Sequence, residues 1–354
     1  MHFSSEVIEV TDYHTAVELF FARGWTDGLA VVPPTEDLVE AMIRASGREP
    51  HEEIGEIPPA QGIATIEKLA INSVMAGCRP EYFPIIIAAV EAMLEPEHNL
   101  NGVQTTTHCC VPLVIVNGPI AKELKFNAGD GVFGSGFRPN GTVGRAIRLT
   151  LWNLGGNIPG EVDKSTQAHP GKWSFCIAEK EDANPWEPLH VERGLDKEKN
   201  AVTVFSCEAP HSVLCYGTAK QMLATLVSSL TTLGSNNVHA MGETLVVLNL
   251  WQARQFHQEG WSKQDIKMYL WQHARTALGQ IKAVDALGVA GQFWPKWVDV
   301  EDESFLVPLT ARPEDIHLMV AGGDTYFAAV CPGWGWLGGF AVTKEVGAKH
   351  LPVG

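Results

Sequence analysis

The chain has few basic residues for its length. Its 354 residues include 26 Lys and Arg against 41 Asp and Glu, which gives a formal net charge of -15. Nucleic acids and anionic membrane surfaces bind proteins through basic faces. The composition therefore predicts that neither nucleic acid nor a membrane is a partner.

A long apolar segment is also missing. No run in the sequence reaches the roughly 18–20 apolar residues that a membrane-spanning helix needs. Residues 1–6 have neither the basic region nor the apolar core of a signal peptide. From these two absences we expect a cytoplasmic protein.

Several motifs with a defined chemistry are absent. The seven cysteines form no Cys-x-x-Cys pair, and their odd number in a long chain argues against a disulfide framework. No P-loop, Gly-x-Ser-x-Gly or His-Glu-x-x-His sequence occurs. Residues 129–134 and 333–338 have dinucleotide-loop glycine spacing, but neither lies in a βαβ context. NAD(P) is therefore not an expected cofactor.

Apolar periodicity predicts an α/β fold, with a mixed or parallel sheet flanked by helices. The residues from 161 to 196 show little regular pattern and predict a long irregular central segment. Strands are expected at residues 29–32, 111–116, 201–205, 244–248 and 316–320. Helices are expected at residues 13–23, 35–46, 65–75, 81–94, 142–154, 218–233, 251–257 and 263–281.

The domain organisation is only weakly marked. We divide the chain into an N-terminal α/β region, residues 1–196, and a C-terminal α/β region, residues 197–354. Ligands of α/β sheets bind at the carboxyl ends of strands. Asn117, Cys207 and Gly322 follow or end expected strands, so we expect them near such an edge.

The sharpest local signal is the sequence His108-Cys109-Cys110, directly before an apolar strand. A thiolate is a strong nucleophile and a soft metal ligand, and an adjacent imidazole can share its proton or a metal. Because side chains alternate along a strand, only one of the two thiols is expected to face a site. The alternative is that both cysteines are small core residues.

Arginines gather in a region without acidic residues. Residues 131–160 contain no Asp or Glu but include Arg138, Arg145 and Arg148. We expect Asn140 to cap a helix that begins near residue 142, with Arg138 and Arg145 binding an anionic substrate. The alternative is that the arginines pair with acidic residues elsewhere in the chain.

Further polar residues lie in the irregular central segment and after it. We expect His169 and His190 to act as acid or base, because histidine titrates near neutral pH. Lys172 and Glu192 are expected to help bind the substrate. A metal site built from these histidines and from Cys207 or Cys215 is an open alternative, although no pair has a diagnostic spacing.

Several stretches resemble a widespread family of poorly characterised bacterial proteins, and the last third resembles the UGSC domain of selenoprotein-related proteins. The likeness is carried by Trp-Thr-Asp-Gly-Leu-Ala-Val-Val-Pro-Pro-Thr at 25–35, His-Pro-Gly-Lys-Trp-Ser-Phe-Cys-Ile-Ala-Glu at 169–179, and residues 72–82, 116–119, 144–149, 185–194, 260–265 and 313–323. No Cys-Gly-Ser-Cys motif occurs in this chain. The resemblance implies a soluble bacterial enzyme linked to thiol or selenol redox chemistry of the thiol-disulfide oxidoreductase kind.

Three hypotheses follow from these residues. The first is an enzyme that acts on a small anionic molecule through Cys109 or Cys110, as an oxidoreductase or lyase, with His108 as proton partner. The second is a metal-dependent lyase or hydrolase, in which His108, Cys109 and Cys110 are candidate ligands of a transition metal. The third is a non-catalytic protein that binds a small molecule or a metal. In each case the buried helices and the 11 tryptophans favour a homo-oligomer.

Overall fold

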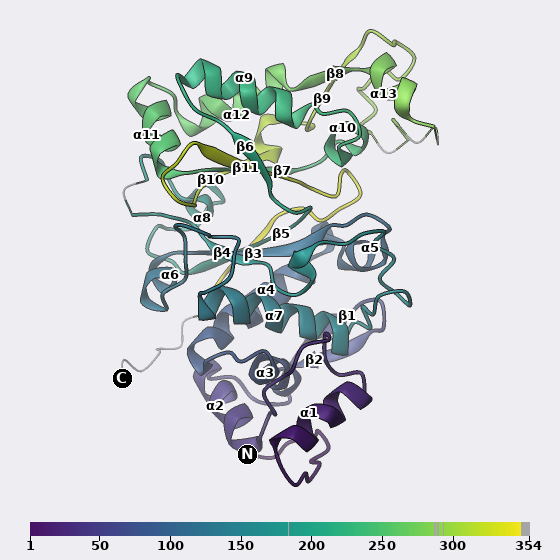
Figure 1. Cartoon of the computed structure of the whole chain (residues 1–354), viewed down its shortest axis with the longest axis vertical. Coiled ribbons are helices and arrows are strands. Elements are labelled where there is room, and N and C mark those ends of the chain that lie inside the picture. The colour runs from purple at the N-terminus through teal and green to yellow at the C-terminus, as the bar shows by residue number, and fades with distance from the viewer. Residues whose placement is uncertain (183, 287, 289, 293, 348–354) are drawn as a thin grey trace.

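The computed structural model describes residues 1–182, 184–286, 288, 290–292 and 294–347. Two four-stranded sheets form its centre (Figure 1). The first has the order β12-β5-β3-β4, and the second has the order β10-β7-β11-β6. Their strands are β3 (Val111–Asn117), β4 (Cys176–Ala178), β5 (Ala201–Cys207), β6 (His211–Leu214), β7 (Thr244–Leu248), β10 (Ile316–Val320), β11 (Phe327–Pro332) and β12 (Val342–Glu345).

The helices are α1 (Tyr13–Ala22), α2 (Glu36–Ser46), α3 (Ile66–Met75), α4 (Phe83–Met93), α5 (Leu100–Thr105), α6 (Pro119–Glu123), α7 (Arg138–Asn153), α8 (Leu189–Glu192), α9 (Ala219–Leu230), α10 (Asn236–Ala240), α11 (Leu250–Gln258), α12 (Lys263–His273) and α13 (Leu278–Val284). Short 3-10 helices are η1 (Pro80–Tyr82), η2 (Pro96–His98), η3 (Pro170–Lys172) and η4 (Pro313–Asp315). Two small hairpin-like sheets pair β1 (Glu53–Ile57) with β2 (Gly62–Thr65) and β8 (Arg275–Ala277) with β9 (Leu306–Pro308). No helix in the described ranges is long and apolar enough to cross a membrane.

The two sheets pack face to face and are covered by helices on their outer faces. Leu113 and Phe205 of the first sheet share a buried cluster with Leu245 and Met319 of the second. Figure 1 shows α4 and α7 on the outer face of the first sheet, and α9 and α12 on the outer face of the second. The central strands β3, β5, β7 and β10 are buried along their whole length, so their sequences are largely apolar. The predicted α/β class with mixed sheets and flanking helices is confirmed.

Local sequence signals place several helix ends correctly. Thr65 caps α3, with its hydroxyl oxygen accepting a hydrogen bond of 3.2 Å from the backbone N–H of Lys68. Gly47 ends α2 in the left-handed conformation that glycine adopts without strain. Two other local predictions were wrong. Residues 29–32 form no strand, and the helix expected at residues 263–281 is interrupted by β8.

The central segment is less irregular than the sequence predicts. Within residues 161–196 the chain forms η3, β4 and α8, and β4 pairs in parallel with β3. Apolar burial on both sides explains why so short a strand forms without a clear alternating pattern. The division drawn near residue 197 does not separate the sheets, because β5 and β12 both follow it and join β3 in the first sheet.

The direction of β5 corrects one expectation about the site. β3 and β5 are antiparallel, with Val111 opposite Cys207 and Asn117 opposite Ala201. Cys207 and Asn117 therefore lie at opposite ends of the sheet, about 20 Å apart for strands of this length. Polar residues beside Cys207 can therefore contact residues that precede β3, but not residues that follow β3.

Two glycines of α7 allow a matched test of how closely this helix packs. A methyl group on Gly144 would lie 2.5 Å from the backbone nitrogen of Phe175 and would also meet Ser174, whereas one on Gly141 would meet nothing within 4 Å. We expect Gly144→Ala to destabilise the protein by about 1–3 kcal/mol through overpacking. Gly141→Ala is expected to be neutral or to stabilise it by about 0.5–1 kcal/mol. Urea unfolding of both variants measures the difference, and equal stabilities would contradict this packing.

Candidate functional site

The chain brings His108, Cys109 and Glu208 together at one end of the first sheet. One potential ligand atom of each residue lies within 4.8 Å of the others. Because Val111 is opposite Cys207, the residues just before β3 and just after β5 emerge side by side. In sequence, His108 and Glu208 are 100 residues apart. The site therefore depends on antiparallel strand register, not on a local motif.

The two nitrogens of His108 have different surroundings. Nε2 lies 2.7 Å from Oε1 of Glu208, and the two side chains are 18% and 28% exposed. Nδ1 is buried and has no hydrogen-bond partner. When Nε2–H donates to the carboxylate, the neutral ring keeps its lone pair on Nδ1. This lone pair is suited to receive a proton, whereas a metal ion shared with Glu208 would take the place of the proton on Nε2.

Hydrogen bonds hold the loop that carries His108. The backbone N–H of His108 donates to the hydroxyl of Thr106 over 3.1 Å, and that hydroxyl also accepts from the indole of Trp334 over 3.2 Å. The hydroxyl of Ser165 donates to the carbonyl oxygen of His108 over 3.1 Å. Because the loop is tied internally and to two other segments, the imidazole is presented in a defined position.

The two adjacent thiols, which both precede β3, differ in accessibility. Cys109 is half-buried, whereas Cys110 and the remaining five cysteines are buried. Burial, together with the charge of Glu208, raises the pKa of Cys109. Burial raises the pKa of Cys110 to about 12. Both residues are thus thiols rather than thiolates at neutral pH, and Cys110 fits the alternative of a core residue.

Two cations and one carboxylate lie beside the thiols. Nζ of Lys172 forms an ion pair of 2.8 Å with Asp163, and burial lowers the pKa of this lysine. Arg148 is almost completely buried, with hydrogen bonds to Oδ1 of Asn157 and the carbonyl oxygen of Lys172. Lys172 lowers the pKa of Cys110, and Cys110 raises the pKa of Arg148. Both cations therefore lie near that thiol. Lys172 therefore lies near the cysteines, and its role in substrate binding stays a prediction.

His169 lies near the same cluster but is tied to the backbone. Its Nδ1 accepts a hydrogen bond of 3.1 Å from the N–H of Gly171, and its ring packs edge-on against Phe175. The one proton of the neutral ring is then on Nε2, beside the backbone of Cys207. Burial lowers the pKa of His169 to about 4, so the ring is neutral at pH 7. This geometry favours a positioning role over that of a general base.

His190 and Glu192 lie elsewhere. His190 is fully buried, with Nδ1 at 3.9 Å from Oε1 of Glu181, a carboxylate that accepts from the backbone N–H of Gly118 beyond β3. Glu192 forms ion pairs with Lys263 and Lys267 of α12. These contacts are at the opposite end of β3 from His108. The structure therefore does not bring these two predicted residues together with the cysteines.

The arginine loop also differs from its prediction. Helix α7 begins at Arg138, so Asn140 lies inside its first turn and does not cap it. The side chain of Asn140 is buried and exchanges two hydrogen bonds with the backbone of Asn127. Arg145 forms a bidentate pair with Asp27, and Arg138 donates to the carbonyl oxygen of Gly77. The alternative of pairing with an acidic residue elsewhere in the chain thus describes Arg145.

Sequence reasoning missed Glu208 and Asp163. Glu208 directly follows Cys207, which the sequence marked as a strand end, so its position was within one residue of a predicted edge. Nothing in the sequence identifies Asp163 as the partner of Lys172, because the turn that presents it has no regular pattern.

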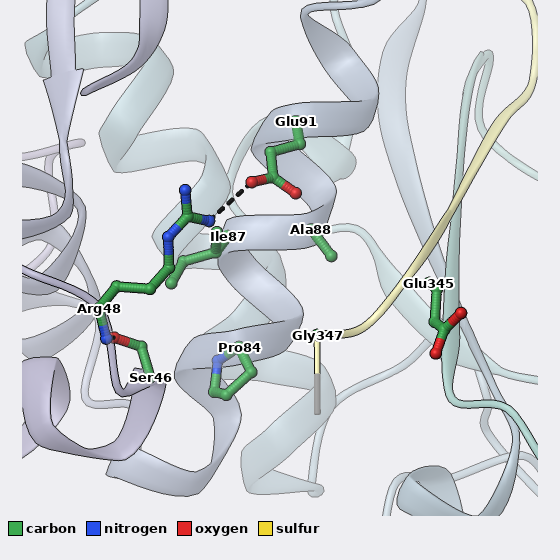
Figure 2. Close-up of a pocket in the computed structure, with 8 residues that line it drawn as sticks. All are labelled: Ser46, Arg48, Pro84, Ile87, Ala88, Glu91, Glu345 and Gly347. Carbon is green, nitrogen blue, oxygen red and sulfur yellow. Dashed lines mark hydrogen bonds and ion pairs between the residues drawn. The ribbon is translucent and has the colours of Figure 1, made fainter. Parts of the chain in front are cut away.

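Figure 2 shows a pocket of about 400 Å³ away from this cluster. It lies beside α4, and its most prominent polar contact is the ion pair of 2.7 Å between Arg48 and Glu91. Arg48 also pairs with Glu52, and these partners raise its pKa. Because the charges in this pocket already compensate one another, it offers no free group comparable to Nδ1 of His108.

No protein-family model matches the chain, and no curated protein matches it significantly. The resemblance to UGSC-related proteins stays a prediction. Function is therefore inferred from the chemistry of the site alone.

Cysteine alkylation tests the geometry of the thiols. In protein treated with chelator, we expect iodoacetamide to modify Cys109 first, and more slowly at pH 7 than it modifies a free cysteine, because a raised pKa leaves little thiolate. Glu208→Gln removes a negative charge beside the thiol, so it should lower the pKa of Cys109 and increase the rate several-fold. Peptide mapping by mass spectrometry gives site and rate. Modification of Cys109 faster than free cysteine would contradict this description of the site.

Proposed function

We propose that the chain is a metal-dependent enzyme, a hydrolase or lyase, whose divalent ion is held by His108, Cys109 and Glu208. The observation that carries this proposal is the convergence of one nitrogen, one sulfur and one oxygen ligand within 4.8 Å. These atoms come from two segments that only the folded sheet brings together.

Zinc is the ion that suits this set best. Zinc binds imidazole nitrogen, thiolate sulfur and carboxylate oxygen at about 2.0–2.3 Å, and its catalytic sites commonly combine three protein ligands with one water. A thiolate and a carboxylate together neutralise its two positive charges. The water on the fourth position would lose a proton near neutral pH and supply the nucleophile or base.

The raised pKa of Cys109 favours a metal over a free thiol nucleophile. Burial and Glu208 both stabilise the protonated thiol, which is the unreactive form. A bound divalent cation reverses this effect, because it replaces the proton on sulfur and compensates the charge of Glu208. The same acidic neighbour that hinders a nucleophile therefore strengthens a metal site.

Lys172 and Arg148 support an anionic substrate. Among the described residues, no carboxylate lies within contact distance of Arg148. Lys172 forms its ion pair with the carboxylate of Asp163. The two cations thus leave one uncompensated positive charge beside the thiols. A carboxylate or phosphate group of a small molecule would be attracted to this charge.

Thiol chemistry is the second candidate function. It is favoured by the partial exposure of Cys109 and by the unpartnered Nδ1 of the preceding His108. In this mechanism His108 takes the thiol proton, with Glu208 orienting the ring and stabilising its positive charge.

Metal content distinguishes these functions. We expect the protein, purified without chelator, to contain close to one equivalent of zinc or another transition metal by elemental analysis. Cys109→Ser and His108→Ala should each lower metal content at least ten-fold, because each removes a ligand. Cys110→Ser is the matched control and should keep its metal, since this thiol is buried outside the cluster.

Two outcomes would contradict the metal proposal. One is wild-type protein without metal that also binds none when titrated with zinc. The other is equal metal loss in the Cys109 and Cys110 variants, which would show that the loop is disturbed as a whole. If the wild type is active without metal and Cys109→Ser is inactive, the thiol mechanism is supported.

A further inference from the structure

Strand β6 lies at the edge of the second sheet, whose order ends with β11-β6. Among the residues that the structure describes, β6 pairs with β11 alone. His211, Ser212 and Leu214 are exposed, whereas Val213 is buried. An uncovered edge strand presents backbone donors and acceptors to any chain of matching geometry.

The register shows which backbone groups face outward. Just beyond β6, the N–H of Cys215 donates to the carbonyl oxygen of Tyr326 over 2.7 Å, so Cys215 faces β11. Backbone direction alternates along an antiparallel strand. Ser212 and Leu214 therefore direct their N–H and C=O groups to the open side.

An exposed apolar surface continues from this edge. Leu214, Tyr216, Tyr326 and Phe327 are 53%, 55%, 59% and 52% exposed. Leu214 is directly opposite Phe327 in the sheet, and the rings of Tyr216 and Tyr326 are 5.6 Å apart. Large apolar side chains that are contiguous and exposed mark a site of protein contact.

The two chain segments that form this edge carry no acidic residues. The segments 209–217 and 325–331 contain no Asp or Glu, in a chain with 41 of them and a net charge of -15. Two copies of so acidic a protein repel each other over most of their surface. This repulsion is weakest at a neutral apolar edge. Edge strands that avoid pairing commonly carry charged side chains, and β6 carries no Asp, Glu, Lys or Arg.

We propose that β6 is a homodimer interface, in which two copies pair this strand antiparallel about a two-fold axis at Val213. Ser212 of one copy then lies opposite Leu214 of the other. The second sheet of one copy and the second sheet of the other become one continuous sheet. The arrangement is self-complementary, as two-fold symmetry requires. It is independent of the proposed metal site.

A strand of four residues supplies few hydrogen bonds, so the side chains must add area. Stable interfaces bury about 800 Å² on each partner. The exposed Leu214, Tyr216, Tyr326 and Phe327 flank the strand and extend the contact on both copies. Aromatic residues of this kind often contribute much of the binding energy of an interface.

Light scattering coupled to size-exclusion chromatography tests the proposal on the full chain. The wild-type mass should be twice 38.5 kDa. Ser212→Pro removes an outward N–H and should halve the mass, because the pairing between copies needs this donor. Leu214→Lys should act in the same way through charge and lost apolar contact. The matched controls are Ser212→Ala and Leu306→Lys, the latter at a leucine that is 54% exposed on β9.

A monomeric wild type would overturn the proposal, as would a dimer that persists in both Ser212→Pro and Leu214→Lys. Circular dichroism and thermal unfolding of each variant show whether the fold is retained. If Ser212→Pro disturbs the fold, Leu214→Lys alone tests the interface. The metal content of the monomeric variants should equal that of the wild type. Failure of the metal proposal therefore leaves this test intact.

Discussion

The antiparallel register between β3 and β5 is the constraint on which the site depends. It places Val111 opposite Cys207, and so brings the loop before one strand against the loop after the other. The contact between His108 and Glu208 follows from this register and from no local signal. Both strands are buried on each face, so the register is held by apolar packing and not by the polar residues at the end. The chemistry of the site is in this sense a consequence of the core.

Burial in the hydrophobic cores also accounts for most of the cysteines. Cys207 and Cys331 belong to the same inter-sheet cluster as Phe205 and Met319, and burial raises the pKa of Cys207 well above its ordinary value. A thiol in such surroundings behaves as a small apolar side chain. Cys109 differs because the chain leaves the sheet there and exposes the sulfur to the polar end of the sandwich. The difference in accessibility between the adjacent Cys109 and Cys110 follows from this change in burial.

The sequence predicted what short-range chemistry determines and failed where long-range pairing decides. The α/β class and the helices α3 and α4 follow from apolar periodicity, which operates within a few residues. His108 and Cys109 were found because their residue types are rare and chemically active. Glu208 could not be found, since its role exists only once β5 is placed beside β3. Cys207 was expected beside Asn117 because the sheet was assumed to be parallel there.

The electrostatics of the site discriminate between its two candidate chemistries. A nucleophilic thiol needs surroundings that stabilise negative charge on sulfur, and such sites are electropositive. Here the nearest ionisable neighbour that shifts the pKa of Cys109 is a carboxylate, while Lys172 opposes it only partly and is itself paired with Asp163. Two anionic ligands and one imidazole are unfavourable together without a cation. A divalent ion resolves this conflict directly, because the same charges that raise the pKa of the free thiol become the source of its affinity.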